Sequence, residues 1–318
     1  MNRTAILIAA GLSLSASLHA IPAQALTTRT FIASFGTDTG GCGRAAPCRT
    51  LTYAYGQTSP GGEINILDAA GFGTLNITGS ISIISNGTAG ILVPSGGTGI
   101  TINAGASDAV NLRGLNIEGA GVGAIGIQFL SGKSLVVENC VARNLAFSGL
   151  VFIPSSLSLT ALSVSNSYFL DNAANGILVQ TGGSGPVTAV IDRVVFYDNG
   201  FAGLNVFGTS GTGLLVVTVT DSVAGNNVNG SNGTGFLIQS TVGHSVSNLA
   251  VTHSVAHGNS FGISAFGANA TVRVAQSTVM GNVTGYSASS SGVILSYGDN
   301  YIDANTGNTG TLGSALKQ

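Results

Sequence analysis

The chain is built from a repeated block that ends in asparagine. Successive blocks end at intervals of 23 to 32 residues, and in most of them a glycine follows the asparagine within eight residues, usually with an apolar residue after it. A recurring period in this range is typical of stacked supersecondary units rather than of an ordinary globular core. The repeated asparagines are Asn144, Asn172, Asn199, Asn227, Asn259, Asn282 and Asn305.

Composition narrows the class of protein. Hydrophobic residues make up 44% of the chain and charged residues only 7%, which argues against disorder because a disordered chain has little to bury. The formal net charge is -2, so no strongly basic face is indicated and we expect no nucleic-acid partner.

Residues 1–25 have the features of a secretory leader. Arg3 supplies a positive start, an interrupted apolar run follows, and Ala23-Gln24-Ala25 is a small-x-small cleavage site. No later apolar run reaches the length of about 18 residues that a membrane-spanning helix needs. We therefore expect a protein secreted to the periplasm or beyond the cell, with a mature chain starting near Leu26 and no transmembrane segment. The sequence leaves the oligomeric state open.

Alignment of the blocks on their asparagines indicates strands. Apolar, often β-branched residues recur at spacings of two before each asparagine and again after each glycine, and the connections are too short for helical crossovers. Successive blocks must then stack strand on equivalent strand. The pattern predicts an all-β parallel β-helix over residues 64–307, right-handed because parallel crossovers strongly prefer that hand. Residues 26–63 are expected to form a disulfide loop and a cap with a short helix at 50–57, and residues 308–318 a tail or second cap.

The asparagine column and the cysteines have structural interpretations. Asparagine tolerates the left-handed αL conformation of a sharp turn, and stacked side-chain amides can hydrogen-bond along the column. Cys140 stands four residues before an asparagine, in a column with Tyr168 and Val195 that we expect to face inward, which predicts a buried thiol. Cys42 and Cys48 favour a local disulfide over free thiols. No histidine lies near them in sequence to complete a metal site.

A polar column stands six residues before the asparagines. Adjacent members could place Asp221 between Arg193 and His253, a group suited to acid–base catalysis or to gripping a sugar, with Asn166 and Glu138 as binding residues. We expect this group to lie in an exposed groove beside the loops at 207–216 and 239–248. The alternative is a solvated turn column without a function. The column consists of Glu138, Asn166, Arg193, Asp221, His253, Gln276 and Asp299.

Two further patterns carry weaker hypotheses. Asp171 and Asp198 precede successive asparagines, and equivalent positions one coil apart match the roughly 5 Å carboxylate pair of retaining glycosidases, although Asp-Asn is also common turn chemistry. Val151, Leu178 and Leu237 fall at outward positions of the glycine-led strands, which predicts an exposed apolar contact surface.

The amino-terminal motifs resemble those of a known group. Phe31-Ile32-Ala33-Ser34, Gly36-Thr37-Asp38, the Cys42 to Thr50 element and Gly61-Gly62-Glu63-Ile64-Asn65-Ile66 look like the start of secreted bacterial right-handed parallel β-helix proteins of the pectate-lyase-like superfamily. The resemblance implies that fold, with the same hand, over most of the mature chain. It implies no reaction, because the calcium-binding carboxylate cluster and the Asn-Thr-Asp, Gly-His-Gly and Arg-Ile-Lys motifs of the family's enzymes are missing.

Two functions from different classes remain open. The first is a non-catalytic solenoid that binds polysaccharide or belongs to a surface or matrix. The second is a polysaccharide lyase or glycoside hydrolase with an unfamiliar site. We expect no cofactor in either case, and the sequence does not decide whether the protein is an enzyme.

Overall fold

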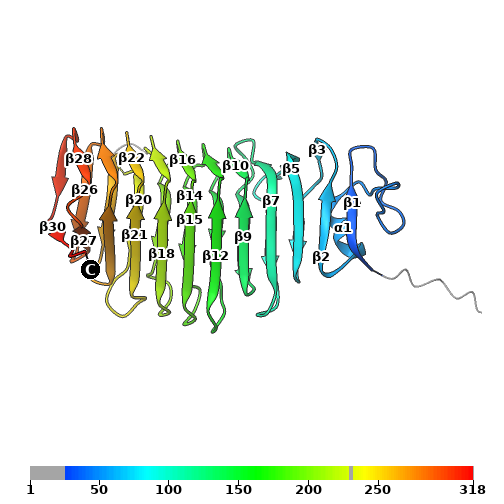
Figure 1. Cartoon of the computed structure of the whole chain (residues 1–318), viewed down its shortest axis with the longest axis horizontal. Coiled ribbons are helices and arrows are strands. Elements are labelled where there is room, and N and C mark those ends of the chain that lie inside the picture. The colour runs from blue at the N-terminus through cyan, green and yellow to red at the C-terminus, as the bar shows by residue number, and fades with distance from the viewer. Residues whose placement is uncertain (1–25, 229–231, 318) are drawn as a thin grey trace, which may run out of the picture.

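The chain winds into a solenoid of stacked coils (Figure 1). The computed structural model describes residues 26–228 and 232–317, and the predicted leader lies outside these residues. All strand pairings between named strands are parallel, and each strand pairs with the equivalent strand of the next coil. The predicted parallel β-helix fold is therefore confirmed, but parallel pairing extends beyond the predicted bounds of 64–307, from Thr27 to Ser314.

Each regular coil contains a long strand, a short strand and a glycine-led strand. The long strands are β2 (Thr58–Ile66), β5 (Ile81–Leu92), β7 (Ala109–Glu118), β9 (Ser134–Glu138), β12 (Thr160–Ser165), β15 (Val187–Asp192), β18 (Leu215–Thr220), β21 (Ser247–Thr252), β24 (Ala270–Ala275), β27 (Val293–Ser296) and β30 (Leu312–Ser314). The short strands are β3 (Ala70–Gly71), β10 (Val141–Arg143), β13 (Tyr168–Leu170), β16 (Val195–Tyr197), β19 (Val223–Gly225), β22 (Val255–His257), β25 (Thr278–Met280) and β28 (Tyr301–Asp303).

The glycine-led strands form a separate sheet. They are β4 (Leu75–Ile77), β6 (Thr98–Asn103), β8 (Ile125–Ser131), β11 (Ser148–Phe152), β14 (Asn175–Gln180), β17 (Ala202–Phe207), β20 (Thr234–Gln239), β23 (Phe261–Phe266), β26 (Thr284–Ser289) and β29 (Gly307–Thr309). A side chain at the leading glycine would enter the core: a Cβ on Gly176 would lie 2.8 Å from the ring of Phe196. The glycine thus lets the chain turn inward without a clash.

The amino-terminal end is closed by the short helix α1 (Leu51–Gln57), which the sequence predicted over 50–57. Thr50 caps the helix by accepting a hydrogen bond from the Tyr53 amide, and Leu51 and Ala54 are buried beneath it. Asp38 accepts hydrogen bonds from Thr50 and from the Arg49 amide. Burial would raise the pKa of the Asp38 carboxyl, but these hydrogen bonds outweigh that effect and lower it.

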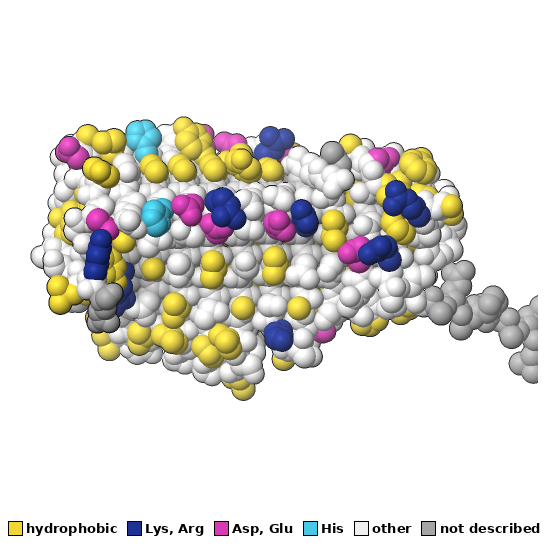
Figure 2. Space-filling view, in the orientation of Figure 1, with side chains coloured by type: hydrophobic (Ala, Val, Ile, Leu, Met, Phe, Trp, Pro, Cys, Tyr) yellow, Lys and Arg dark blue, Asp and Glu magenta, His cyan; other side chains and the backbone are white. Residues whose placement is uncertain are grey.

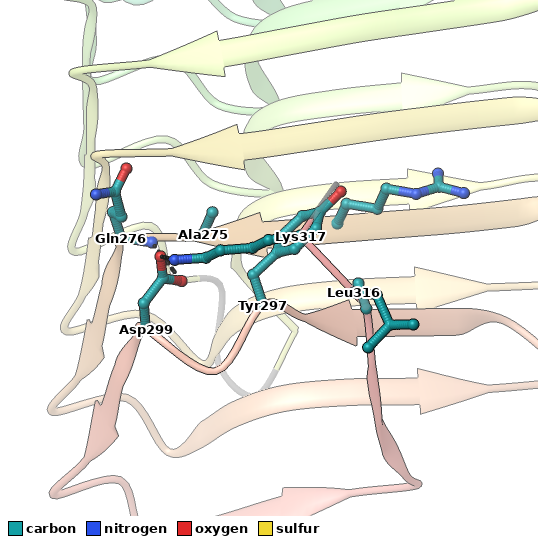
Figure 3. Close-up of a pocket in the computed structure, with 8 residues that line it drawn as sticks. Ala275, Gln276, Tyr297, Asp299, Leu316 and Lys317 are labelled. Atoms are coloured by element: carbon teal, nitrogen blue, oxygen red, sulfur yellow. Dashed lines mark hydrogen bonds and ion pairs between the residues drawn. The ribbon is translucent and has the colours of Figure 1, made fainter.

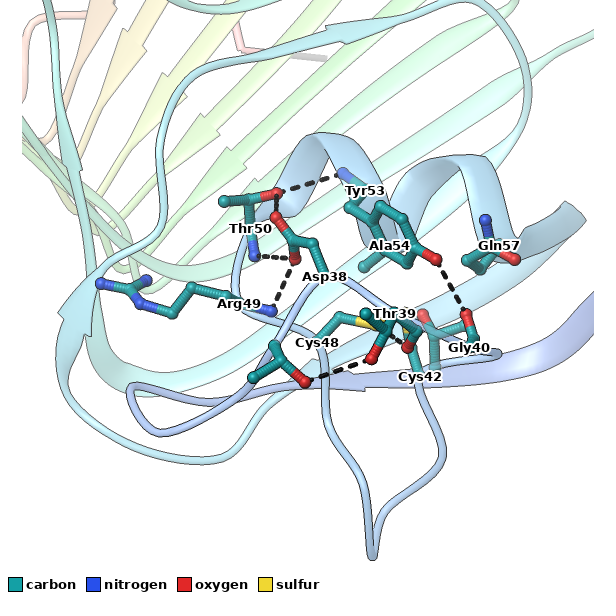
Figure 4. Close-up of a disulfide and its surroundings, with 12 residues drawn as sticks. Asp38, Thr39, Gly40, Cys42, Cys48, Arg49, Thr50, Tyr53, Ala54 and Gln57 are labelled. Atoms are coloured by element: carbon teal, nitrogen blue, oxygen red, sulfur yellow. Dashed lines mark hydrogen bonds between the residues drawn. A yellow bond between two sulfur atoms is a disulfide. The ribbon is translucent and has the colours of Figure 1, made fainter.

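Cys42 and Cys48 form a disulfide beside this helix (Figure 4). Their loop covers the outer edge of β1 (Thr27–Ile32), because the Phe31 amide donates to the Cys42 carbonyl at 2.8 Å and the Cys48 amide donates to the Phe31 carbonyl at 2.9 Å. The other edge of β1 pairs with β2. The loop therefore satisfies backbone groups that an open sheet edge would expose.

Two sharp turns in each coil place the polar residues. The first joins the long strand to the short strand through one αL residue, such as Arg193 at φ 52° or Asp221 at φ 48°. The second follows the short strand through another αL residue, such as Asp171 or Asp198, both at φ 54°. The ladder asparagine comes one residue later, so the prediction that the ladder asparagines themselves adopt αL was wrong.

The asparagine ladder runs from Asn172 to Asn305. Side-chain amides donate to the Oδ1 of the next asparagine at 2.9–3.0 Å in every step of the series Asn172, Asn199, Asn227, Asn259, Asn282 and Asn305. Asn144 does not belong to it: it is exposed, has φ 53°, and occupies the place of Asp171. Leu145 takes the ladder position in that coil, because its amide donates to Asn172 Oδ1.

A second ladder, of serines, lies inside the first turn. The Ser222 amide donates to the Ser254 hydroxyl at 3.2 Å, and the Ser254 amide donates to the Ser277 hydroxyl at the same distance. Cys140 occupies this column, with its amide bonded to the Ser167 hydroxyl. Cys140 is 1% exposed as expected, but the reason given for its burial was wrong, because Tyr168 and its equivalents face outward.

Candidate functional site

The proposed acid–base residues occupy successive first turns on the surface. The register pairs Asp192 with Thr220 and Thr220 with Thr252, so Arg193, Asp221 and His253, which follow them, stand one coil apart. All three are exposed and have φ between 47° and 52°. Polar residues gather here partly because β-branched and bulky apolar residues disfavour αL.

These three residues do not form one interacting group. Arg193 is engaged on the other side, where its Nε donates to Asn166 Oδ1 at 2.8 Å and its guanidinium lies 2.6 Å from an Asp192 carboxylate oxygen. Among residues 26–228 and 232–317, no hydrogen bond or ion pair joins Arg193, Asp221 and His253 to one another. The structure therefore supports the contact between Arg193 and Asn166 and leaves the three-residue catalytic group a hypothesis.

Glu138 does not belong to the polar column. Its backbone pairs with Ser165, which places it at the end of the long strand, and Asn139 takes the αL position of the turn. Its carboxylate lies 3.8 Å from Arg113 Nε, in an exposed ion pair. The assignment of Glu138 to the column was wrong because equivalent residues in these two coils are 27 positions apart, as Glu138 and Ser165 are. The asparagines used for the alignment, Asn144 and Asn172, are 28 positions apart.

The groove predicted beside the loops is also wrong. Residues 207–216 and 239–248 lead into the amino ends of β18 and β21, whereas Asp221 and His253 follow their carboxyl ends. A six-residue strand separates loops and turns by roughly 20 Å. The Ser245 hydroxyl of the second loop instead forms a buried hydrogen bond with Thr181, which follows β14, at 3.0 Å.

The glycine-led strands do not offer the predicted contact surface. Val151, Leu178 and Leu237 are 2%, 8% and 6% exposed, so these outward-pointing side chains are nearly covered. Apolar groups at these positions are not available to a partner.

A row of exposed apolar side chains does lie on the short strands, while other exposed apolar residues, such as Leu157 and Val242, are scattered over the loops. The middle residue of each short strand points into the core, so the first and third residues point outward. We call the outward side of β10, β13, β16, β19, β22 and β25 the short-strand face. Tyr168 is 48% exposed, Tyr197 44%, Val223 37% and Met280 39%. Leu170, Val195 and Val255 add partly exposed apolar surface between them.

Polar turns border the short-strand face on both sides. Figure 2 shows charged side chains in a line along the long axis, with hydrophobic side chains gathered along the upper edge, where Figure 1 places the short strands. A depression of about 450 Å³ on the first-turn side is lined by Gly87, Asn139, Val141, Asn166, Tyr168 and Arg193. A second depression, of about 370 Å³ on the second-turn side, is lined by Gly121, Asn144, Leu145, Ala146, Asp171, Asn172, Ala173, Asp198 and Gly200. Both depressions flank β10, β13 and β16.

Two carboxylates lie on the second-turn side. Asp171 and Asp198 occupy equivalent positions in neighbouring coils, since Leu170 pairs with Tyr197 before them. Asp198 Oδ1 accepts a hydrogen bond from the Asn226 side chain. The described residues contain no group of three or more His, Cys, Asp or Glu side chains that could hold a metal ion.

Another depression, of about 830 Å³, lies near the carboxyl end (Figure 3). Residues 315–317 cross it, and Lys317 reaches Asp299 with an Nζ–Oδ2 distance of 2.8 Å. Gln276 and Asp299, the last members of the polar column, line it. An internal ion pair thus forms part of its lining.

Comparisons with known proteins agree with this architecture. A family model described as right handed beta helix region matches residues 63–220. The fold is similar to that of a pectate lyase, Pel9A, with a TM-score of 0.56 and 18% identity over 92% of this chain and 78% of the other. It is also similar to an alginate lyase from Paenibacillus sp. str. FPU-7, with a TM-score of 0.53 and 15% identity over 90% of this chain and 100% of the other. No curated protein matches the sequence. The chain thus has the right-handed parallel β-helix fold.

Tyr168 and Tyr197 are the candidate residues that sequence analysis missed. The signal was present, because each begins or ends a three-residue strand whose middle residue is a phenylalanine, Phe169 or Phe196.

In the described residues no helix is long and apolar enough to cross a membrane.

Proposed function

We propose that this protein binds a polysaccharide along its short-strand face, outside the cytoplasm. The observation that carries the proposal is the apolar strip of Tyr168, Val195, Tyr197 and Val223, bordered by polar turns on both sides. The predicted leader at residues 1–25 supports secretion, to the periplasm or to a surface or matrix outside the cell. Amino-terminal sequencing of the mature protein tests the cleavage near Ala25.

A sugar chain matches this arrangement in chemistry and in shape. Sugar rings carry apolar C–H faces and hydroxyl edges, so the faces can rest on tyrosine and valine while the edges meet polar groups. Asn166 and Arg193 are within reach on one side, and Asp198 on the other. The strip repeats at each coil, about every 4.8 Å, which suits an extended polymer lying along the solenoid axis.

The solved structures named above give supporting context. One is a pectate lyase and the other an alginate lyase, and each is named for a polysaccharide. At 15–18% identity the likeness extends to the fold, and the residues of the short-strand face supply the rest of the proposal.

Binding is tested by affinity electrophoresis of the purified mature protein through gels that contain a panel of soluble polysaccharides. A glycan that binds should slow the migration of the parent protein. The Tyr168→Ala and Arg193→Ala variants should migrate in that gel as they do in a gel without glycan. Val190→Ala is the matched control, because Val190 is 51% exposed on the long strand β15, away from the strip. If the parent migrates unretarded with every glycan, the proposal is wrong.

Polysaccharide cleavage is the second candidate function. It is favoured by Asp171 and Asp198, which line one depression in successive coils, at a spacing near that of the carboxylates of retaining glycosidases. Incubation with the same panel, scored for new reducing or unsaturated ends, tests it. Asp198→Asn would then remove product formation. Loss of product in Asp221→Ala would point instead to the group of Arg193, Asp221 and His253.

A further inference from the structure

The ring of Tyr197 rests on a glycine in the next coil. Tyr197 pairs with Gly225 across β16 and β19, and a Cβ placed on Gly225 would lie 2.9 Å from both Cδ2 and Cε2 of the tyrosine. Gly225 is buried, whereas its equivalents Arg143, His257 and Met280 are exposed. The tyrosine therefore covers the glycine, and any side chain at 225 would displace the ring.

The ring remains open to solvent although it is supported from below. Tyr197 is 44% exposed, so the contact with Gly225 fixes the ring without burying it. A fixed aromatic ring costs little conformational entropy when a ligand settles on it, because its rotamer is already chosen. This is the geometry of a stacking platform.

The charges around the platform disfavour a polyanion. Asp198 follows Tyr197 directly, and Asp171 lines the same depression. The nearby guanidinium groups are already paired, Arg193 with Asp192 at 2.6 Å and Arg143 with Glu118 at 2.8 Å. A negatively charged polymer on this strip would meet uncompensated carboxylates, which repel it, whereas an uncharged sugar would not.

We infer that Tyr197, held in place by Gly225, is a stacking platform for an uncharged polysaccharide with flat ring faces, such as a β-1,4-linked glucan. This inference rests on the proposed function and names its ligand class. Gly225 is a positioning residue, and its effect passes entirely through the tyrosine ring. Its φ is not in the left-handed region, so an alanine there is compatible with the backbone and has only to move the exposed ring.

Isothermal titration calorimetry with cellohexaose tests the inference on the full mature protein. Tyr197→Ala should weaken binding about tenfold, in line with the loss of one stacked ring. Gly225→Ala should weaken it less, by about threefold to tenfold, with an unchanged melting temperature. In the double variant Gly225→Ala/Tyr197→Ala, the glycine substitution should add nothing to the loss from Tyr197→Ala, because its partner is gone. Val190→Ala serves again as the control.

A second titration with hexagalacturonate, together with added salt, tests the uncharged ligand class independently of the proposed polysaccharide-binding function. Cellohexaose binding should be unchanged between low salt and about 0.5 M, because no ion pair is made. If only hexagalacturonate binds, and salt weakens it, the polysaccharide-binding function stands and the uncharged ligand class is wrong. Equal affinity of the Tyr197→Ala variant and the parent for cellohexaose would overturn the platform. If the protein binds no glycan of the panel, the proposed function itself is wrong.

Discussion

The side-chain amide of Asn199 donates to Asn227 Oδ1 in the next coil at 3.0 Å, and also to the Phe169 carbonyl at 3.0 Å. Its own Oδ1 accepts from Asn172 at 2.9 Å, and the residue is fully buried. Asn199→Ala would remove a hydrogen bond from buried partners on both sides, while Asn227 Oδ1 would keep the bond from the Asn199 backbone amide and the Asn172 side chain its bond to the Ala142 carbonyl. We expect it to lower the free energy of unfolding by roughly 2–4 kcal/mol, measured by urea denaturation.

The matched control for this prediction is Asn144→Gly. Asn144 is exposed, adopts αL, and stands outside the ladder, and glycine accepts that conformation. The control should change stability by less than about 1 kcal/mol. Equal losses in the two variants would contradict the distinction between the ladder and the turn.

Asn144 also shows how far the sequence could determine the register. The repeat period, the strands and the short helix could all be predicted from the sequence because each has a strong local pattern. Asn144 and Asn172 look equivalent in sequence, yet one occupies the αL position and the other the ladder position that follows it. Asparagine suits both places, so residue type alone does not separate them. A shift of one residue reverses which side chains face inward.

That shift explains why the site was only partly predicted. Tyr168 was assigned to an inward column together with Cys140, which removed it from the candidate surface. The polar column could be predicted because polar residues recur at the first turn. Contact between its members depends instead on the direction of their side chains. Arg193 turns toward Asn166 and Asp192 rather than toward Asp221. Nothing in the spacing of the repeat specifies that choice.

The stability of the protein should fall at alkaline pH through Cys140. Burial raises the pKa of its thiol from 9.0 to about 11, so the unfolded chain loses its proton at lower pH than the folded one. The protonated Cys140 thiol contributes fully to the free energy of unfolding below about pH 9. This contribution, roughly 2–3 kcal/mol, is lost as pH rises toward 11. Comparison of unfolding free energies between the parent and Cys140→Ser over this range isolates it from tyrosine ionisation. Parallel curves for the two proteins would refute the burial of an ionisable thiol.

Cys140→Ser should itself be well tolerated at neutral pH. Serine occupies the equivalent place in the coils of Ser167, Ser222 and Ser254, where its hydroxyl bonds to the carbonyl two residues earlier. Cys140 Sγ already lies 3.3 Å from the Glu138 carbonyl. We expect a change of less than about 1 kcal/mol in thermal or urea unfolding. Cys140→Ala, which cannot make the bond, should be the less stable variant of the two.

Reduction of the Cys42–Cys48 disulfide should loosen the amino-terminal cap. The loop it closes covers the edge of β1 through backbone bonds at Phe31 and Ala33. Opening a short loop costs about 2–3 kcal/mol, and the loss should be local because the distant coils contact only their neighbours. Hydrogen exchange with and without reductant should therefore rise in residues 27–50 and remain unchanged in the ladder coils. Uniformly faster exchange along the chain would contradict a local cap.

The carboxyl-terminal segment should be held to the solenoid by Lys317 in a manner that depends on pH. The Lys317 ammonium, with help from the Gln276 amide, lowers the pKa of the Asp299 carboxyl below its ordinary value of 3.8. Because the pKa of Asp299 is lower in the folded protein, its contact with Lys317 stabilises the fold fully at pH values above the ordinary pKa. This stabilisation is lost as the pH falls through the folded-state pKa. The reporter is the Ala315 amide, which donates to the Ser296 carbonyl at 2.9 Å. Its protection factor, corrected for intrinsic exchange, should be smaller in Lys317→Ala than in the parent at neutral pH, and equal in both once Asp299 is protonated in the folded protein. Lys133→Ala, at an exposed lysine elsewhere, should match the parent at every pH. A difference at Ala315 that persisted at low pH would show that Lys317 holds the segment by packing rather than by charge.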